Sequence, residues 1–149
     1  MKLSHVMTRK VKTVSPSTTV RDAAKTMKCF DIGILPVCDG KELLGVLTAR
    51  DIVVRVVADG QHPCRTTVRE AMTPCVVCCH VEDNVAKAVK IMKDRNIRRL
   101  IVVGRRNILA GVVTMGDIVS RAGDEGAIAA KLLPLSQVFP CTPDQTFVA

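Results

Sequence analysis

The chain has 149 residues, of which 48% are apolar, so it can form one compact domain or two half-size units that share a core. Its longest apolar runs are far shorter than the roughly 20 residues of a membrane-spanning helix, and no secretion signal is visible at the N-terminus, so we expect a cytoplasmic protein with reduced cysteines and no membrane contact. The net charge of +8 favours anionic partners, whereas the lack of Trp and Tyr argues against a surface that stacks the bases of single-stranded nucleic acid.

Apolar side chains at alternate positions indicate strands, and apolar side chains three or four residues apart indicate helices. On this basis the first half of the chain predicts the order strand, helix, strand, strand, helix. Turn-forming residues separate these elements, and polar residues cap the helices. The expected elements are a strand at 11–14, a helix after the cap Ser17 or Thr18, a hairpin of strands 34–38 and 43–47 about Asp39-Gly40, and a helix after the cap Thr48.

The second half predicts the same order of elements after a linker at 59–63 that is rich in turn-forming residues. Further along, residues 125–133 favour one more helix, and three prolines make 134–149 an irregular tail. The expected elements of this half are a strand near 76–79, a helix at 83–95, strands at 100–103 and 108–113, and a helix that begins at Thr114.

The two halves also repeat in sequence. A shift of 65 residues places Met7-Thr8 on Met72-Thr73, and a shift of 66 places Gly45-Val46-x-Thr48-x-x-Asp51 on Gly111-Val112-x-Thr114-x-x-Asp117. Because a half of about 60 residues buries too little surface to be stable alone, we expect the two copies to pack sheet to sheet as one α/β fold with a pseudo-twofold axis. The expected divisions are 7–65 for the first repeat, 72–128 for the second repeat and 129–149 for a C-terminal tail.

The repeated Gly-Val-x-Thr-x-x-Asp segment is the part of the repeat best suited to bind a ligand. A glycine at the end of a strand lets another backbone or a ligand approach closely. Thr48 and Thr114 begin helices, whose free N–H groups attract anions such as phosphate. Asp51 and Asp117 lie one turn later, where a carboxylate can accept hydrogen bonds from ribose hydroxyls. The same residues also form a variant of the capping box, in which they satisfy only the N–H groups of the helix itself, and the motif alone leaves both interpretations open.

Cys75, Cys78, Cys79 and His80 form a cluster of potential metal ligands. Alternate residues of a strand point to opposite faces, so Cys78 and Cys79 cannot both face one ion without distortion. Free cysteines are common small residues of protein cores. Packing is therefore the preferred interpretation of the cluster, and metal binding or redox sensing is the alternative.

Signatures of catalysis are absent from the sequence. None of the three histidines has a serine or cysteine partner and an orienting acid at a recognisable spacing, and the glycine motifs of nucleotide-hydrolysing and dinucleotide-binding folds are missing. We therefore expect no enzymatic activity. The arginines between 95 and 106 leave nucleic-acid binding as an alternative, which the scarcity of aromatic residues disfavours.

The repeat resembles the cystathionine-β-synthase (CBS) domain family in its element order, in the Met-Thr that opens each copy and in the two Gly-Val-x-Thr-x-x-Asp segments. Leu35-Pro36-Val37 also resembles the second strand of that family. The resemblance covers about residues 3–123. It implies a Bateman module, which is a pair of CBS domains, of the stand-alone bacterial or archaeal type, with two related clefts between the repeats. Such modules commonly bind AMP, ADP, ATP or S-adenosylmethionine, and the resemblance implies no other cofactor.

The resemblance also assigns roles to individual residues. Asp51 and Asp117 would hold ribose hydroxyls, Thr48 and Thr114 would contact phosphate, and the backbone of two strands in each copy would flank an adenine. Since Gly33-Ile34 of the first copy is replaced by Arg98-Arg99 in the second, and Arg50 by Gly116, the two sites would differ in affinity. The adenine-flanking residues would be Thr13, Val14, Ser15, Ile34, Leu35 and Pro36 in one cleft and Cys78, Cys79, His80, Arg99, Leu100 and Ile101 in the other, with Arg50, Arg98 and Arg99 as candidates for phosphate.

Taken together, these features predict a regulatory module that senses an adenine nucleotide or an S-adenosyl compound. Because the chain has no room for an effector domain, its output would pass through a partner protein or a homodimer. A ligand-free dimerisation scaffold is the main alternative. Modules of the CBS family commonly pair through their helices, and the surface for such pairing would come from Ala23, Met27, Ala88 and Met92, or from the last helices.

Overall fold

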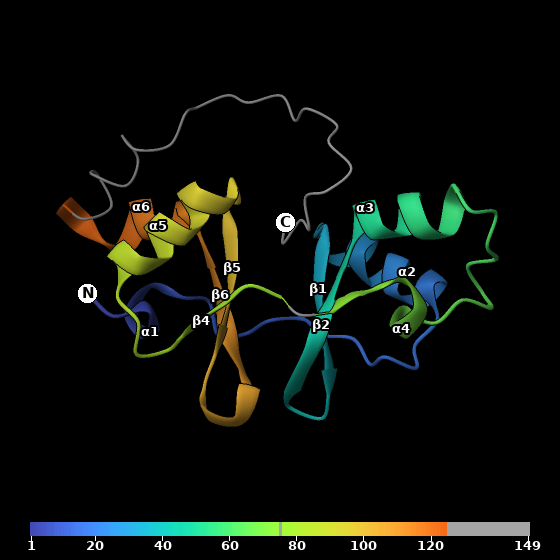
Figure 1. The fold of residues 1–149 in the computed structure, drawn as a ribbon, viewed down its shortest axis with the longest axis horizontal. Coiled ribbons are helices and arrows are strands. Elements are labelled where there is room, and N and C mark those ends of the chain that lie inside the picture. Colours follow the sequence, from blue (N-terminus) through green and yellow to red (C-terminus); the bar gives the residue numbers. More distant parts are fainter. Residues whose placement is uncertain (75, 125–149) are drawn as a thin grey trace. The chain divides into compact units, whose positions relative to one another are not determined.

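The computed structural model describes residues 1–74 and 76–124. Cys75, the helix expected at 125–133 and the tail expected at 129–149 lie outside the described residues. The described chain mixes helices with two three-stranded sheets, which confirms the expected α/β fold class (Figure 1). In chain order the elements are α1 (Leu3–Val6), α2 (Val20–Phe30), β1 (Ile34–Asp39), β2 (Glu42–Thr48), α3 (Ala49–Asp51), the π-helix η1 (Ile52–Val57), α4 (Val68–Ala71), β3 (Thr73–Pro74), β4 (Cys78–His80), α5 (Val85–Arg95), β5 (Arg99–Val103), the 3-10 helix η2 (Arg105–Asn107), β6 (Leu109–Thr114) and α6 (Met115–Arg121).

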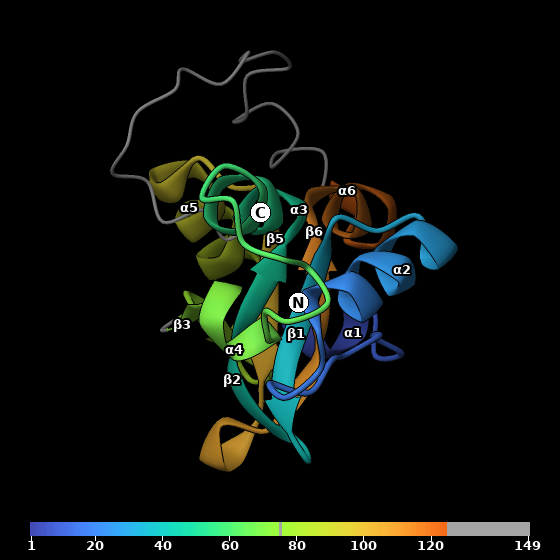
Figure 2. The ribbon, with the colours of Figure 1, turned by 90° about the vertical axis from the view of Figure 1, so that its right-hand side faces the viewer.

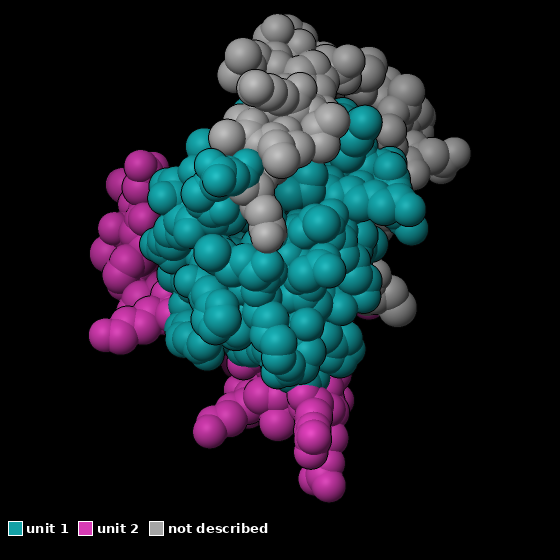
Figure 3. Space-filling view, turned by 90° about the vertical axis from the view of Figure 1, so that its left-hand side faces the viewer, with its two compact units in different colours: residues 1–9, 77–104, 110–148 teal, residues 10–76, 105–109, 149 magenta. Residues whose placement is uncertain are grey.

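The chain divides into two compact units (Figure 3). Unit 1 contains Met1–Arg9, Val77–Gly104 and the chain from Ala110, whereas unit 2 contains Lys10–Val76 and Arg105–Leu109. The Met-Thr segments, Met7-Thr8 and Met72-Thr73, are therefore exchanged. Each opens one repeat in the sequence but belongs to the unit built mainly from the other repeat.

The sheet of unit 2 has the strand order β1-β2-β3. β1 and β2 form the expected antiparallel hairpin, and β3 adds to β2 through the pairs Gly45↔Pro74 and Val46↔Thr73. The strand expected at 11–14 is reduced to one parallel bridge between Val14 and Val37. The N–H of Val14 donates to the carbonyl of Pro36 at 3.0 Å, so this segment still lies along the outer edge of β1.

The sheet of unit 1 repeats this arrangement with the order β4-β5-β6. β4 runs parallel to β5, with Cys78 opposite Ile101. Thr8 bridges Val112 of β6, just as Thr73 pairs with Val46 of β2 in unit 2. In both units, therefore, the same four segments lie side by side in the same order, and the last of them is an exchanged Met-Thr segment.

Polar side chains cap the two long helices. Thr19, rather than the expected Ser17 or Thr18, caps α2, because its Oγ1 accepts the N–H of Asp22 at 3.2 Å. Asn84 caps α5 through the N–H of Lys87 at 2.8 Å. α2 ends at Asp31 and α5 ends at Asn96. Both residues have left-handed backbone conformations, as is common at helix ends.

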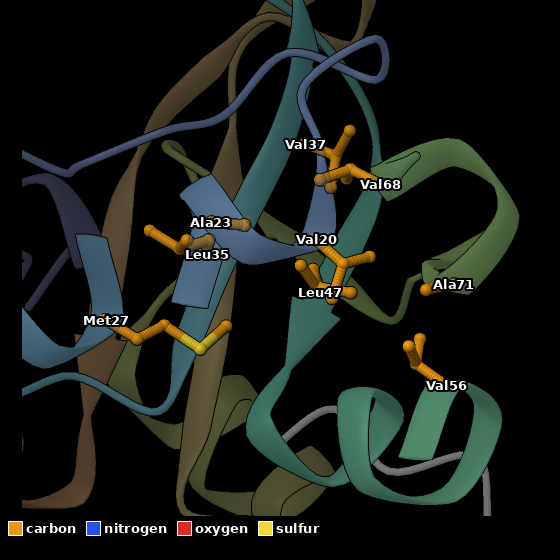
Figure 4. Packing of buried hydrophobic residues seen from close by; sticks show 9 residues of the cluster. All are labelled: Val20, Ala23, Met27, Leu35, Val37, Leu47, Val56, Val68 and Ala71. Atoms are coloured by element: carbon orange, nitrogen blue, oxygen red, sulfur yellow. The ribbon is translucent and has the colours of Figure 1, made fainter. Parts of the chain in front are cut away.

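The core of unit 2 lies between its sheet and its helices. α2 packs against β1 (Figure 2), and α4 packs against α2 and η1. No helix among the described residues is long and apolar enough to cross a membrane. Figure 4 shows how the apolar side chains of these elements converge, and the buried cluster consists of Val20, Ala23, Met27, Leu35, Val37, Leu47, Val56, Val68 and Ala71.

This packing overturns one expectation about the dimer surface. Ala23 and Met27 belong to the core of unit 2, and Ala88 and Met92 are fully buried in unit 1, so these four residues cannot supply a surface for pairing. Exposed valines occur instead on η1, the helix that follows the Thr-x-x-Asp motif of the first repeat. They are Val53, Val54 and Val57, which are 58%, 48% and 62% exposed.

Candidate functional site

The residues assigned to the first-repeat site gather at one end of β1 in unit 2. Thr48, the last residue of β2, is paired with Ile34, the first residue of β1. The N–H of Ala49 donates to the carbonyl of Gly33 at 2.9 Å, which ties the start of the following helix to the start of β1. Val14 lies along the other edge of β1, next to Pro36. The strand segments expected to flank an adenine therefore adjoin the Thr-x-x-Asp motif.

The residues assigned to the second-repeat site gather in the same way in unit 1. Met115 N–H donates to the carbonyl of Arg98 at 2.9 Å, so the start of α6 lies at the start of β5. β4 runs along the other edge of β5, where Cys78 pairs with Ile101 and Cys79 with Val102. Each predicted group of site residues thus comes together within a single unit.

Thr48 and Asp51 form a capping box. The N–H of Thr48 donates to Oδ2 of Asp51 at 2.8 Å, and the N–H of Asp51 donates to Oγ1 of Thr48 at 3.0 Å. Thr114 and Asp117 form the same reciprocal pair, at 2.9 and 3.0 Å. The capping interpretation of the motif therefore holds in both repeats. A ribose would have to use the acceptor sites that capping leaves on each carboxylate.

The remaining acceptor sites of the two carboxylates have different neighbours. Oδ1 of Asp51 accepts the hydroxyl of Thr73 at 3.1 Å and lies 3.7 Å from Nη1 of Arg55. Oδ2 of Asp117 accepts two hydrogen bonds from Thr114, one from its backbone N–H and one from its hydroxyl at 2.7 Å. Oδ1 of Asp117 lies 3.5 Å from Nη2 of Arg121.

The two arginines that face these carboxylates also anchor the exchanged segments. Arg55 Nη1 donates to the carbonyls of Ala71 and Met72, at 3.0 and 2.6 Å. Arg121 Nη1 donates to the carbonyl of Val6 at 2.9 Å. Sequence reasoning missed this role, although the signal was present. Each copy of the repeat has one of these arginines, four residues after its aspartate and thus on the same face of the helix.

The glycine of the motif also serves the exchanged segments. A Cβ on Gly45 would stand 2.5 Å from the carbonyl oxygen of Thr73, and a Cβ on Gly111 would stand 2.5 Å from that of Thr8. Real Cβ atoms do not approach a backbone oxygen so closely. The sequence left open whether a backbone or a ligand approaches these glycines. In the structure, a backbone segment approaches both of them closely.

The basic and hydroxyl side chains assigned to phosphate differ in their exposure. Arg50, Arg98 and Arg99 are exposed, as suits side chains that would reach a soluble ligand. Thr48 is almost completely buried at 2% exposure, whereas Thr114 is half-buried. The two motifs are therefore alike in backbone geometry but unequal in access to solvent.

The described cysteines of the cluster are packed rather than arranged around an ion. Cys79 is 1% exposed and Cys78 is half-buried, which agrees with side chains on opposite faces of β4. Burial raises the pKa of each thiol to about 11, and the nearby Asp83 carboxylate adds to the effect at Cys79. Within residues 1–74 and 76–124, no group of three or more His, Cys, Asp or Glu side chains is placed to hold a metal ion. Cys75 of the metal alternative lies outside this part of the chain.

The architecture defines a class of protein made of two copies of one α/β repeat, each with a capped Thr-x-x-Asp helix start beside a strand start. A family model described as the CBS domain matches residues 3–58 and 68–124. The chain therefore belongs to the CBS domain family and carries two tandem copies of the domain.

Known members of the family cover most of this chain. The CBS domain-containing protein YhcV of Bacillus subtilis is 38% identical over 125 residues, which span 83% of this chain and 88% of that protein. The crystal structure of Hypoxic Response Protein I with two coordinated zinc ions matches 80% of this chain and 98% of its own, with a TM-score of 0.73 and 30% identity. The CBS domain pair of protein MJ0100, solved in complex with 5′-methylthioadenosine and S-adenosyl-L-methionine, matches 80% of this chain and 94% of its own, with a TM-score of 0.69 and 26% identity.

Proposed function

We propose that the protein is a regulatory module that binds an adenine nucleotide, or an S-adenosyl compound, at the Thr-x-x-Asp motifs. The observation that carries the proposal is the assembly, in each unit, of a threonine and an aspartate beside the start of a central strand. The similar CBS pair of protein MJ0100 was solved with two adenosine-containing ligands, which supports the same ligand class here. The protein would act by binding rather than by catalysis.

Each residue type has a distinct role in the proposed complex. The aspartates, Asp51 and Asp117, accept hydrogen bonds from the ribose hydroxyls. The backbone of the strand starts flanks the adenine, and the half-buried Thr114 would turn its hydroxyl, which donates to Asp117 in the free protein, toward a phosphate. Arg98 and Arg99, both exposed, supply positive charge for a chain of phosphates.

Regulation follows from differential affinity. A ligand shifts a conformational equilibrium only as far as it binds one state more tightly than the other. The output would pass to a second copy of the chain or to a partner protein. The exposed valines of η1 support pairing with a second copy, because a cluster of exposed apolar side chains is typical of a contact surface.

The test is thermal unfolding by differential scanning calorimetry with AMP, ADP, ATP or S-adenosylmethionine. A ligand at about 100 times its dissociation constant adds about 2.7 kcal/mol to the free energy of unfolding. We expect at least one of these ligands to raise the melting temperature, and the double variant Asp51→Ala, Asp117→Ala to lose that rise. GTP serves as the control ligand, since it has the same phosphates and a different base. No rise with any adenosine ligand, or an undiminished rise in the double variant, would disprove the proposal.

A ligand-free dimerisation scaffold is the second candidate. The specific observation in its favour is that capping boxes account for Thr48, Asp51, Thr114 and Asp117 without any ligand. This candidate predicts a dimer whose melting temperature does not change with adenosine ligands. The calorimetric experiment therefore separates the two candidates.

A further inference from the structure

The two carboxylates of the repeated motif accept their hydrogen bonds on different oxygens. An ionised carboxylate has two oxygens with about two acceptor directions each. One oxygen of each aspartate, Oδ2, faces the backbone N–H of its capping threonine. Since Oδ2 faces its own helix start, we take Oδ1 as the oxygen that would meet a ribose. The neighbours of Oδ1 decide whether each site can take a sugar.

At Asp51, Oδ1 is already occupied. It accepts the hydroxyl of Thr73 at 3.1 Å and faces Arg55 at 3.7 Å. Thr73 and Asp51 are only 4% and 9% exposed. A ribose hydroxyl that displaced Thr73 would leave a buried hydroxyl without a partner, which is unfavourable.

At Asp117, Oδ1 is less occupied. Nη2 of Arg121 lies 3.5 Å from Oδ1. The N–H and the hydroxyl of Thr114 both donate to Oδ2 instead. Thr8 stands where Thr73 stands in the other unit, but it is exposed and, within the described chain, forms no hydrogen bond with Asp117. Oδ1 of Asp117 therefore keeps the acceptor direction that Thr73 takes on Oδ1 of Asp51.

The surroundings of Asp117 favour the same site. Gly116 occupies the position that Arg50 has in the first repeat, and even a Cβ added there would meet only Thr114 Oγ1, at 3.6 Å. The second position of α6 thus carries no side chain, whereas its first position is Met115 where the first repeat has Ala49. Arg98, whose carbonyl accepts the N–H of Met115, adds positive charge at the strand start where the first repeat has a glycine.

We infer that the chain binds one phosphorylated adenosine ligand, at Asp117, and that Thr73 closes Asp51 to ribose. This inference rests on the proposed function. It adds that the site of the second repeat binds the ligand and that Thr73 blocks the site of the first repeat. In the first repeat, the hydroxyl of Thr73 takes the place of a ribose hydroxyl on the carboxylate. Asp51 then serves, with Arg55, to hold the exchanged Met72-Thr73 segment.

The test is isothermal titration calorimetry of the full chain with AMP and ATP, read as the number of ligands per chain. We expect one ligand per chain for the natural sequence and a loss of at least tenfold in affinity for Asp117→Ala. Thr73→Val keeps the shape of the side chain and removes its hydroxyl, so it frees Oδ1 of Asp51 and should add a second, weaker binding event. Thr8→Val is the matched control and should leave one ligand per chain. Circular dichroism verifies that every variant is folded.

The outcomes separate this inference from the proposed function. Two ligands per chain in the natural sequence, full affinity in folded Asp117→Ala, or a single event in Thr73→Val would overturn the inference while nucleotide binding itself stands. Absence of binding by both nucleotides and by S-adenosylmethionine would overturn the proposed function and the inference together.

Discussion

Among single residues, the cysteines show best how burial decides chemical behaviour. Cys78 and Cys79 have pKa values of about 11, because burial disfavours the charged thiolate. Cys29 and Cys64 are exposed, Cys29 on α2 and Cys64 in the loop before α4. Since the thiolate is the form that attacks electrophiles and binds metal ions, the two buried thiols are poorly suited to either reaction at neutral pH.

We therefore predict a clear order of alkylation. At pH 7.5, fewer than about one in a thousand of the Cys78 and Cys79 thiols is ionised, because the pH lies well below their pKa. Iodoacetamide should modify Cys29 and Cys64 first and leave Cys78 and Cys79 largely unmodified until the protein unfolds. Fragment-ion mass spectrometry of a time course measures each site, and the urea-unfolded protein is the control. Rapid labelling of Cys78 in the folded protein would restore the metal or redox interpretation of the cluster.

At the scale of elements, the exchanged Met-Thr segments are the least expected part of the fold. Each adds to the edge of a sheet, where a glycine admits its backbone and an arginine binds its carbonyls. The motif Gly-Val-x-Thr-x-x-Asp with the following arginine therefore has a structural role in addition to any role in binding. Its glycine and arginine receive the segment, and its threonine and aspartate cap the next helix.

Substitution of the motif glycines tests this structural role. Gly45→Ala and Gly111→Ala place a Cβ 2.5 Å from the carbonyl oxygen of Thr73 and of Thr8, so the segment must shift outward. We expect each variant to lose about 1–3 kcal/mol of unfolding free energy, the range of overpacked sites. Gly33→Ala is the matched control, because a Cβ there meets nothing within 4 Å. Urea unfolding followed by far-UV circular dichroism measures the difference, and equal stability of all three variants would contradict the argument.

Local patterns predicted most elements, because strand alternation and helix caps depend on neighbouring residues. The hairpin of β1 and β2 and the caps at Thr48 and Thr114 are where the sequence placed them. The four-residue helices α1 and α4 were not predicted, since they are too short to show an apolar period. The π-helical geometry of η1 and the exchange of the Met-Thr segments also escaped prediction.

The candidate site was predictable to a similar extent. The repeat and the family resemblance identified residues that each unit brings together, because they lie at the ends of strands that pair locally. The contact between Thr73 and Asp51 could not be foreseen, since it joins residues 22 positions apart through the exchange. Sequence differences such as Arg50 against Gly116 suggested unequal sites, but only the structure shows that the hydroxyl of Thr73 contacts Asp51.

At the scale of the whole molecule, the position of the exposed apolar residues predicts how two chains would pair. The helices α2 and α5 turn their apolar faces inward, whereas η1 exposes three valines. Each repeat places a helix directly after its Thr-x-x-Asp motif, and in the second repeat the exposed Val119 lies on that helix, α6. η1 follows directly after α3, the short helix that Thr48 and Asp51 cap. Pairing through η1 would therefore place the dimer contact next to the capped motif in the chain.

Charged substitutions on η1 test this pairing. We expect the natural chain to sediment at twice its 16.1 kDa mass and the double variant Val53→Asp, Val57→Asp to sediment as a monomer, because burying two carboxylates in an apolar contact is unfavourable. Both valines are exposed in the single chain, at 58% and 62%, so the monomeric variant should remain folded, as far-UV circular dichroism verifies. Ile108→Asp, at an exposed apolar residue outside η1, is the control and should remain dimeric. A double variant that still sediments as a dimer would place the contact elsewhere, and a monomeric natural chain at micromolar concentration would refute pairing altogether.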